Sequence, residues 1–501
     1  MNAETPPAAD LNPPGSVAQV GVLCLAFVVL ADLLFYKQTL GWATGLYGLL
    51  LAGVVMARER YVPRGAPGVL IVLGTASLCL WCVEQPGAWT VGLGLLGLIS
   101  VALVARQGWT GNALVWAGRW ASFLLIGWCT LFWDALAAPS AQAGKASRAT
   151  PVRRALANWL LPVLLTLAFL GLFSIANPVI SKWVSDAWGG LGDFLDDLVS
   201  GGRILIWLLV AVWAWALLRH RSALADSLAG SLSAPQGAPA GLLSPGIVTR
   251  CLVLFNALFA VQTALDVTYL WGGRALPAGM THTEYAHRGA YPLVATALLA
   301  ALFVLAAFRA GSRSRQMRWP RCLVYAWLAQ NVFLMVSAAW RLRLYVEAYS
   351  LTRLRLAAAV WMCLVACGLL WILARILTRR SNLWLINVNL VTALGVLYAC
   401  SFGDWDAHIA AFNVRHCAEV RGVGPSLDVG YLEHLGPEAL PALIEASRRI
   451  DDEATAQDVA EAVARLKDRL HHQLREWRGW TLRRRRLAAV ADGAQPTYNR
   501  P

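Results

Sequence analysis

Charged residues are scarce in this chain. Only 14% of its 501 residues are Asp, Glu, Lys or Arg, whereas soluble domains average about 25%. Hydrophobic residues make up 58% of the chain, and its mean hydropathy is +0.53. Apolar runs near the roughly 20 residues that cross a bilayer recur along the sequence. This composition excludes an ordinary soluble protein and predicts an all-α fold, a polytopic helical membrane protein with about 11–12 transmembrane helices.

Acidic residues are fewer than basic residues. The chain has 29 Asp and Glu against 43 Lys and Arg, which gives a net charge of +14. In a soluble protein this excess would suggest binding to nucleic acid. In a membrane protein, Lys and Arg collect in cytoplasmic loops and orient the helices. We therefore expect the lipid bilayer, and no nucleic acid, as the partner of these charges.

Signatures of catalysis and metal binding are missing. Cys79 and Cys82 have the spacing of a redox motif, but they lie in an apolar helix without the strand and helix that this motif needs. His282 and His287 are five residues apart and Glu284 does not directly follow the first of them, so the metalloprotease pattern is not met. The first 16 residues lack Lys and Arg, and hence the basic start of a cleavable signal peptide. We assign no catalytic residue, no metal and no cofactor.

Apolar segments near bilayer-spanning length occur in both halves of the chain. The candidate spans are Val17–Tyr36, Gln38–Met56, Gly68–Val83, Ala88–Ala105, Trp120–Ala138, Trp159–Ala176, Ile204–Leu218, Ile247–Trp271, Leu293–Phe308, Leu323–Trp340, Ala357–Ile376 and Leu383–Ser401. A linker rich in Ala, Gly and Pro divides them. The predicted domains are an N-terminal transmembrane bundle (1–218), a flexible linker (219–245), a C-terminal transmembrane bundle (246–401) and a soluble helical domain (402–501).

The soluble domain shows two apolar stripes at helical spacing. One stripe follows Gly436 and Pro437, and a longer one follows Asp451 and Asp452. The stripes consist of Leu440, Leu443 and Ile444, and of Val463, Leu466, Leu470 and Leu474. Such stripes face each other in a helical hairpin, so we expect them to form its core.

Basic loops predict the orientation of the helices. The Arg-rich loops 309–321 and 379–380 favour the cytoplasm, which leaves the 402–501 domain on the external side. The first half is ambiguous, because 58–64 and 139–155 are both basic and both favour the cytoplasm. Either Trp120–Ala138 does not span, or the N-terminus is external.

Ionisable and tyrosine side chains gather between residues 266 and 356. Charges at the ends of membrane helices are costly unless they are paired or hydrated, so such a group is a candidate site. Asp266 and Arg341 each have a tyrosine on the same helical face, three or four residues later. The candidate ligand-binding or structural polar cluster is Asp266, Tyr269, Glu284, Tyr285, Arg288, Arg341, Tyr345 and Arg353. We expect Asp266, Glu284, Arg288 and Arg341 to meet near the external membrane boundary, either as a ligand site or as an ion-pair lattice that fastens helices.

Several motifs in the second half are similar to those of a known family. They are D-V-T-Y-L-W-G-G, L-P-A-G-M-T-H-T-E-Y-A-H-R-G, R-L-R-L-Y-V-E-A-Y-S-L-T-R-L-R-L, D-W-D-A-H-I-A-A-F-N, G-Y-L-E-H-L-G-P-E-A-L-P-A-L and R-E-W-R-G-W-T-L. The chain resembles the bacterial multi-pass membrane proteins catalogued as domain of unknown function 4153/4173, over roughly Asp266 to Leu482, whereas its N-terminal bundle is similar in hydropathy alone. The resemblance adds Gly289, Tyr349, Leu351, Thr352, Asp406 and Asn413 to the cluster residues, and His287 stands where the family has Arg.

The resemblance implies an integral membrane protein of the bacterial inner membrane and brings no established activity. We interpret the chain as a non-enzymatic protein that binds a ligand or a membrane-protein partner at the external polar cluster, in transport or envelope signalling. The alternative is a membrane-embedded enzyme that acts on a lipid-linked or envelope substrate, with Glu284 or Asp266 as the acid or base.

Overall fold

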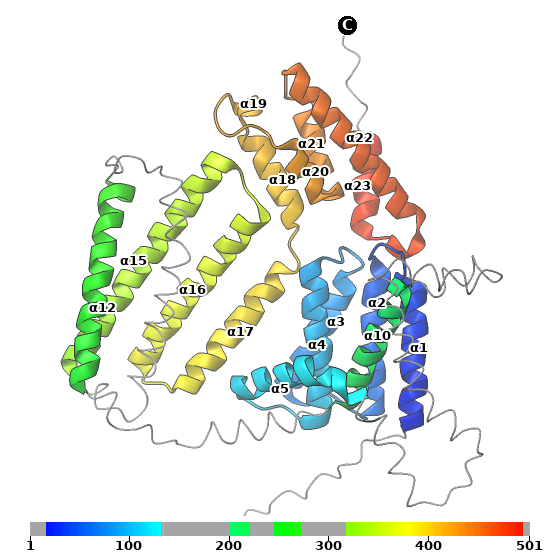
Figure 1. Cartoon of the computed structure of the whole chain (residues 1–501), viewed down its shortest axis with the longest axis horizontal. Coiled ribbons are helices and arrows are strands. Elements are labelled where there is room, and N and C mark those ends of the chain that lie inside the picture. The colour runs from blue at the N-terminus through cyan, green and yellow to red at the C-terminus, as the bar shows by residue number, and fades with distance from the viewer. Residues whose placement is uncertain (1–16, 132–133, 135–200, 221–244, 273–316, 494–501) are drawn as a thin grey trace, which may run out of the picture. The chain divides into compact units, whose positions relative to one another are not determined.

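The structure, a computed structural model, describes residues 17–131, 134, 201–220, 245–272 and 317–493 (Figure 1). All secondary structure in these ranges is helical. Six of the described helices are long and apolar enough to cross a membrane. The chain divides into two compact units, and each is described by itself. Unit 1 comprises Met1–Thr110, Val115–Ser231 and Arg475–Leu482, and unit 2 comprises Gly111–Leu114, Leu232–Leu474 and Arg483–Pro501.

Unit 1 is a bundle of helices joined, where the chain is described, by short turns. Its helices are α1 (Val17–Phe35), α2 (Trp42–Arg58), α3 (Gly65–Trp81), α4 (Ala88–Gln107) and α10 (Gly201–Arg219). Short turns make consecutive helices antiparallel, and α4 packs against both α2 and α3 while α1 packs against α10. The buried core includes Phe27, Leu51, Leu103, Trp116 and Leu217.

Basic side chains collect at one end of unit 1, which we call its basic end. Arg106, near the end of α4, donates its Nε to Glu59 after α2 (2.9 Å) and a guanidinium NH to the carbonyl of His220 after α10 (3.1 Å). At the opposite end, Arg203 of α10 donates its Nε to Asp32 of α1 (2.7 Å). Helices α2, α4 and α10 therefore all end at the basic end, which the positive-inside rule assigns to the cytoplasm.

The segment after α4 stays at the basic end. Helix α5 (Ala113–Ile126) is short, and a 3₁₀ turn follows it. Arg119 in α5 donates to the carbonyl of Gly108 (3.0 Å), and Asp134 pairs with Arg219 in the last turn of α10 (2.6 Å). Arg119 and Asp134 therefore both contact the basic end, and the predicted span Trp120–Ala138 is described only for residues 120–131 and 134.

The segment Arg475–Leu482 docks on the opposite end of unit 1. The backbone N–H of Trp42 donates to the carbonyl of Trp480 (3.1 Å), and the last residue of the segment donates its N–H to the carbonyl of Val83 (2.9 Å). A Cβ at Gly41 would lie 2.7 Å from a carbonyl carbon of the segment. The missing side chain at Gly41 therefore permits a close backbone contact between the start of α2 and a segment more than 400 residues later in sequence.

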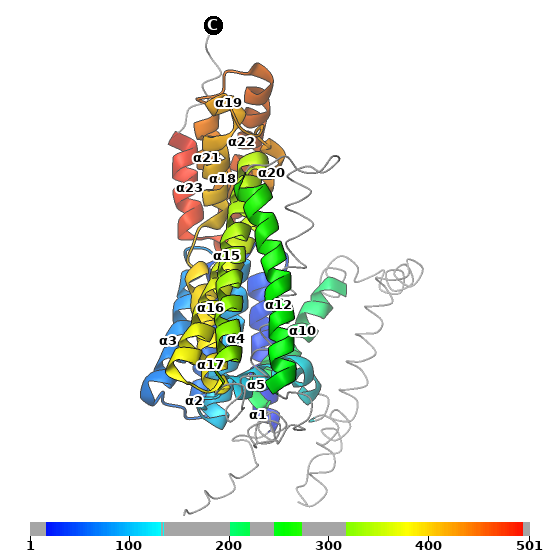
Figure 2. The same cartoon turned by 90° about the vertical axis from the view of Figure 1, so that its left-hand side faces the viewer.

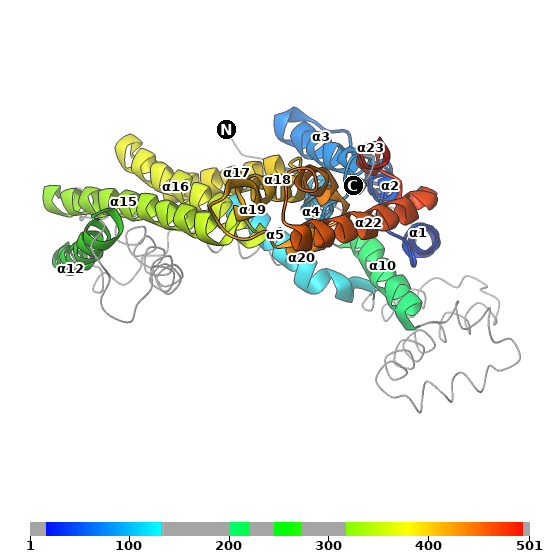
Figure 3. The same ribbon diagram turned by 90° about the horizontal axis from the view of Figure 1, so that it is seen from above.

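In the described part of unit 2, four long helices pack in a row, each against the next (Figure 3). They are α12 (Pro245–Leu265), α15 (Arg318–Tyr349), α16 (Arg353–Thr378) and α17 (Asn382–Cys400). Their shared core centres on the fully buried Trp327 of α15. Arginines mark the start of α12, the start of α15 and the end of α16: Arg250, Arg318, Arg321, Arg375, Arg379 and Arg380. The positive-inside rule assigns this end of unit 2 to the cytoplasm.

A small helical domain follows α17 in unit 2, coloured orange to red in Figure 2. Its helices are α18 (Trp405–His416), α19 (Ala418–Arg421), α20 (Val429–Leu435), α21 (Leu440–Ala446), α22 (Glu453–Arg475) and α23 (Leu482–Gly493). The carboxylate of Asp452 accepts from the N–H of Thr455 (2.9 Å) and caps α22. Leu440, Leu443, Leu466 and Leu470 are fully buried in one cluster, as predicted, and the half-buried Val463 and Leu474 pack against it. Helices α21 and α22 share this core with α18, on which α21 packs.

Truncation of Leu470 should destabilise the helical domain. Its side chain is fully buried, and replacing a buried leucine by alanine costs about 2–5 kcal/mol. The measurement is hydrogen exchange of the α18–α22 amides in the full-length protein. Val490→Ala is the control, because Val490 is 50% exposed in α23. Equal exchange in the two variants would contradict the assigned core.

A topology test follows from the basic ends of the two units. Alkaline phosphatase fused after Tyr498 should be active, and green fluorescent protein at the same position should be dark, because the helical domain follows the non-basic end of α17. A fusion truncated after Arg380 should give the reverse pattern, since this residue lies at the basic end. The same reporter active at both positions would contradict the orientation.

Candidate functional site

Asp266 and Arg341 form a buried ion pair between α12 and α15. The Asp266 side chain is 1% exposed and that of Arg341 is 8% exposed. A guanidinium NH of Arg341 donates to the Oδ1 atom of Asp266, and the side-chain amide of Gln262 donates to the same oxygen (3.0 Å). Both charges are almost completely removed from solvent, so each depends on the other for compensation.

The chain changes its helical geometry at Asp266. Residues Asp266–Trp271 continue α12 as a π-helix, a form found mostly as short insertions that often occur at functional sites. Trp271 donates its indole N–H to the hydroxyl of Ser337 on α15 (3.1 Å). Its ring also stacks on that of Trp340, with 5.8 Å between the centroids. The π-helix therefore presents an acid and an aromatic ring to the same face of α15.

The structure describes only two of the four charged residues that were expected to lie together. Asp266 and Arg341 meet as predicted. Glu284, Tyr285 and Arg288 lie outside the residues that the structure describes. Tyr269 lies in the π-helix, but its side chain is not among the described ones.

Tyr345 takes part in a second set of contacts, at the end of α15. Its ring lies 4.9 Å from that of Tyr349 and 4.5 Å from the guanidinium of Arg355. Arg355 also donates to the carbonyl of Ser350, the residue that ends α15 with a positive φ of 69°. These contacts fix the turn between α15 and α16.

Arg353 contacts the helical domain. Its Nε and Nη2 atoms donate to the two carboxylate oxygens of Asp406 in α18 (2.6 and 2.9 Å), and its backbone N–H donates to the hydroxyl of Tyr431 (2.9 Å). The side-chain amide of Asn413 accepts from the N–H of Leu351 (2.7 Å) and donates to its carbonyl (3.0 Å). We call these five residues the joint. Arg353 therefore belongs to the joint and not to the Asp266–Arg341 pair, because its guanidinium binds Asp406.

Charges of both signs surround the joint. The carboxyl of Glu438 is half-buried, and burial raises its pKa, as does the neighbouring carboxylate of Asp406, while Arg484 and Arg353 oppose the shift. Burial lowers the pKa of the Arg484 guanidinium, and Glu438 opposes that change. The joint is therefore a network of compensated charges, an arrangement that holds two elements in a fixed relation.

Sequence reasoning missed Tyr431 and Glu438. Both lie in the motif G-Y-L-E-H-L-G-P-E-A-L-P-A-L, which indicated only the apolar stripe of the domain and the family resemblance. The polar residues between its leucines were the available signal. Among the described residues no group of three or more His, Cys, Asp or Glu is arranged to hold a metal ion, and His282 and His287 lie outside them.

The chain belongs to the family described as Domain of unknown function (DUF4153), whose model matches residues 22–446. The match begins in α1, so it includes the N-terminal bundle, which the sequence motifs had left out of the resemblance. It ends in α21, before the motif R-E-W-R-G-W-T-L of the docking segment. No curated protein and no solved structure matches the chain.

Removing one partner of the buried pair should be more harmful than removing both. Asp266→Asn or Arg341→Gln alone leaves an uncompensated buried charge, which costs about 3–5 kcal/mol. The double variant should lose much less than the sum of the two single losses. The measurement is a double-mutant cycle scored by thermal unfolding of the purified protein in detergent.

The control for this cycle is a second ion pair on α15. Arg343 and Glu347 are paired at 2.8 Å, but their side chains are 65% and 52% exposed. Exposed pairs contribute at most about 1 kcal/mol, so Arg343→Gln and Glu347→Gln should have small effects. Additive losses at Asp266 and Arg341 would show that the two charges do not compensate each other.

Proposed function

We propose that this protein is a signalling protein of the bacterial inner membrane. In this proposal a ligand or a partner protein binds at the external end of α12 and α15, and the helical domain responds. The single observation that carries the proposal is a continuous covalent path. Arg341, a partner in the buried ion pair, lies on α15, and the turn after this helix carries Leu351 and leads to Arg353, two residues of the joint.

The first step of the argument concerns the pair itself. A buried ion pair contributes little net stability, because desolvation offsets most of its attraction, but the loss of one partner is severe. The relative position of α12 and α15 is therefore sensitive to any group that competes for Asp266 or Arg341. The π-helix at Asp266 supports this role, because such insertions into α-helices are rare and often occur at functional sites.

The second step concerns transmission along α15. About 14 Å of helix separates Arg341 from the turn at Ser350, at 1.5 Å per residue. An α-helix of this length transmits a displacement or a rotation with little deformation. Beyond the turn, the side chain of Asn413 binds both backbone polar groups of Leu351, and Asp406 binds Arg353 through both carboxylate oxygens. A movement of α15 at its external end is in this way passed to α18.

The geometry favours signalling over an enzyme. An acid or base catalyst needs a carboxyl that reaches substrate, whereas Asp266 is 1% exposed and already accepts two hydrogen bonds. The other candidate acid, Glu284, lies outside the described residues. A pair that is buried and compensated suits a conformational switch with two arrangements of the same helices.

The test is the response of α18 to a change at Arg341. Arg341→Gln should raise amide hydrogen exchange not only near Asp266 but also in α18, in full-length protein reconstituted in lipid nanodiscs. Adding Asn413→Ala and Arg353→Gln should abolish the additional response in α18, because the joint is then lost. Arg343→Gln is the matched control and should leave exchange unchanged. A response confined to α12 and α15 would refute the coupling.

A further inference from the structure

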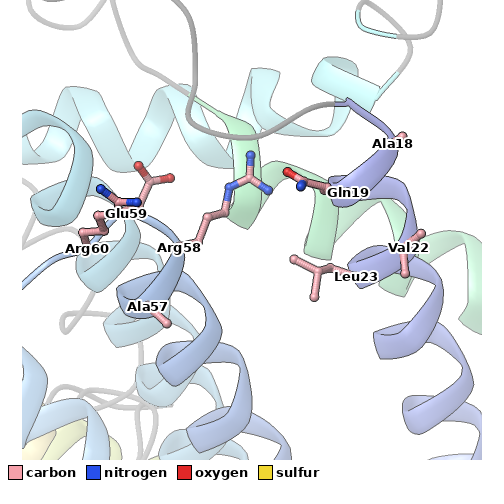
Figure 4. A pocket seen from close by; sticks show the side chains of 8 residues that line it. All are labelled: Ala18, Gln19, Val22, Leu23, Ala57, Arg58, Glu59 and Arg60. Atoms are coloured by element: carbon pink, nitrogen blue, oxygen red, sulfur yellow. The ribbon is translucent and has the colours of Figure 1, made fainter.

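A cavity lies between α1 and α2 at the basic end of unit 1 (Figure 4). It has a volume of about 960 Å³ and is open to the outside. The first two turns of α1 and the end of α2 line it, through Ala18, Gln19, Val22, Leu23, Ala57, Arg58, Glu59 and Arg60. The cavity is independent of the proposed signalling path, which lies wholly in unit 2.

The lining carries an excess of positive charge. Arg58 extends from the end of α2 into the space between the two helices, towards Gln19 of α1 (Figure 4). The one acidic residue of the lining, Glu59, is tied to Arg106 by a 2.9 Å ion pair in which both side chains are buried. Glu59 attracts Arg58 as well, but its single negative charge is shared with Arg106, so the lining keeps a net positive charge from Arg58 and Arg60.

Apart from Gln19, the rest of the lining is apolar, and the length of α1 places it where a lipid headgroup meets its acyl chains. Helix α1 has 19 residues, about 28 Å of helix, which is close to the roughly 30 Å thickness of the hydrocarbon core. Its first residues therefore lie at one face of that core. Val22, one turn further in, is 69% exposed and extends the cavity wall towards the acyl region.

We propose that this cavity binds one anionic phospholipid. Its phosphate group accepts hydrogen bonds from the guanidinium groups of Arg58 and Arg60, since guanidinium matches phosphate geometry. The first methylene groups of its acyl chains lie along Val22 and Leu23. The amide of Gln19 offers a hydrogen bond to the glycerol part. A neutral zwitterionic lipid gains less, because its cationic headgroup is repelled by the two arginines.

The test measures lipid binding to the delipidated full-length protein in detergent by native mass spectrometry. Phosphatidylglycerol should bind about thirtyfold more tightly than phosphatidylcholine with the same acyl chains, as expected for two basic residues near one anionic headgroup. Arg58→Gln combined with Arg60→Gln should abolish this preference. Arg64→Gln is the matched control: it is exposed in the same turn but does not line the cavity, so it should retain the preference.

Further variants and a competitor distinguish a bound lipid from a free phosphate group. Arg58→Lys combined with Arg60→Lys keeps both positive charges and should retain most of the preference for phosphatidylglycerol. If the double Gln variant does not fold, Arg60→Gln alone replaces it, because Arg60 is exposed and its substitution should reduce the preference without disturbing the fold. Glycerol phosphate at the same concentration should not displace the lipid, because it lacks acyl chains. The proposal is overturned if the folded Gln variants keep the wild-type preference, if Arg64→Gln loses as much, or if glycerol phosphate competes fully.

Discussion

The cost of removing charge from water governs the arrangement of the spanning helices. Asp266 and Arg341 are the clearest case: each is buried among apolar side chains and is tolerated because the other is beside it. The same constraint operates in unit 1, where Arg106 and Glu59 are buried together and Arg203 pairs with Asp32. Helices that carry such charges cannot slide or rotate independently, so a few polar contacts determine the register that apolar packing leaves free.

Burial of the helices differs between the two units. In unit 1, α4 contacts α2, α3 and α10, and half of its apolar window is buried. In unit 2 the described helices form a row, and the apolar windows of α16 and α17 are only 11% and 6% buried. A row of helices gains less from mutual packing than a bundle does, and in lipid there is no hydrophobic penalty for this exposure. Specific polar contacts therefore have a larger share in holding unit 2 together.

The sequence predicted features that depend on local pattern. Apolar length gave α1, α4 and α17 to within two residues at either end, and the spacing of Leu466 and Leu470 gave the core of the helical domain. It predicted the Asp266–Arg341 contact, because opposite charges at helix ends need partners. The sequence did not show that Arg353 lies outside the Asp266–Arg341 pair. The partner of Arg353 is Asp406, which comes two helices later in the chain. The sequence also did not predict the contacts of Arg119 and Asp134, because hydropathy carries no information on such pairs.

The docking of Arg475–Leu482 on unit 1 has a consequence for how the protein is made. The backbone of Trp42 and that of Val83 receive their hydrogen-bond partners from this segment, which the ribosome completes only after every candidate span has emerged. The N-terminal bundle is thus synthesised early, but its hydrogen bonds with Arg475–Leu482 form last. Unit 1 therefore acquires its full set of backbone contacts only when a segment far later in the chain is in place.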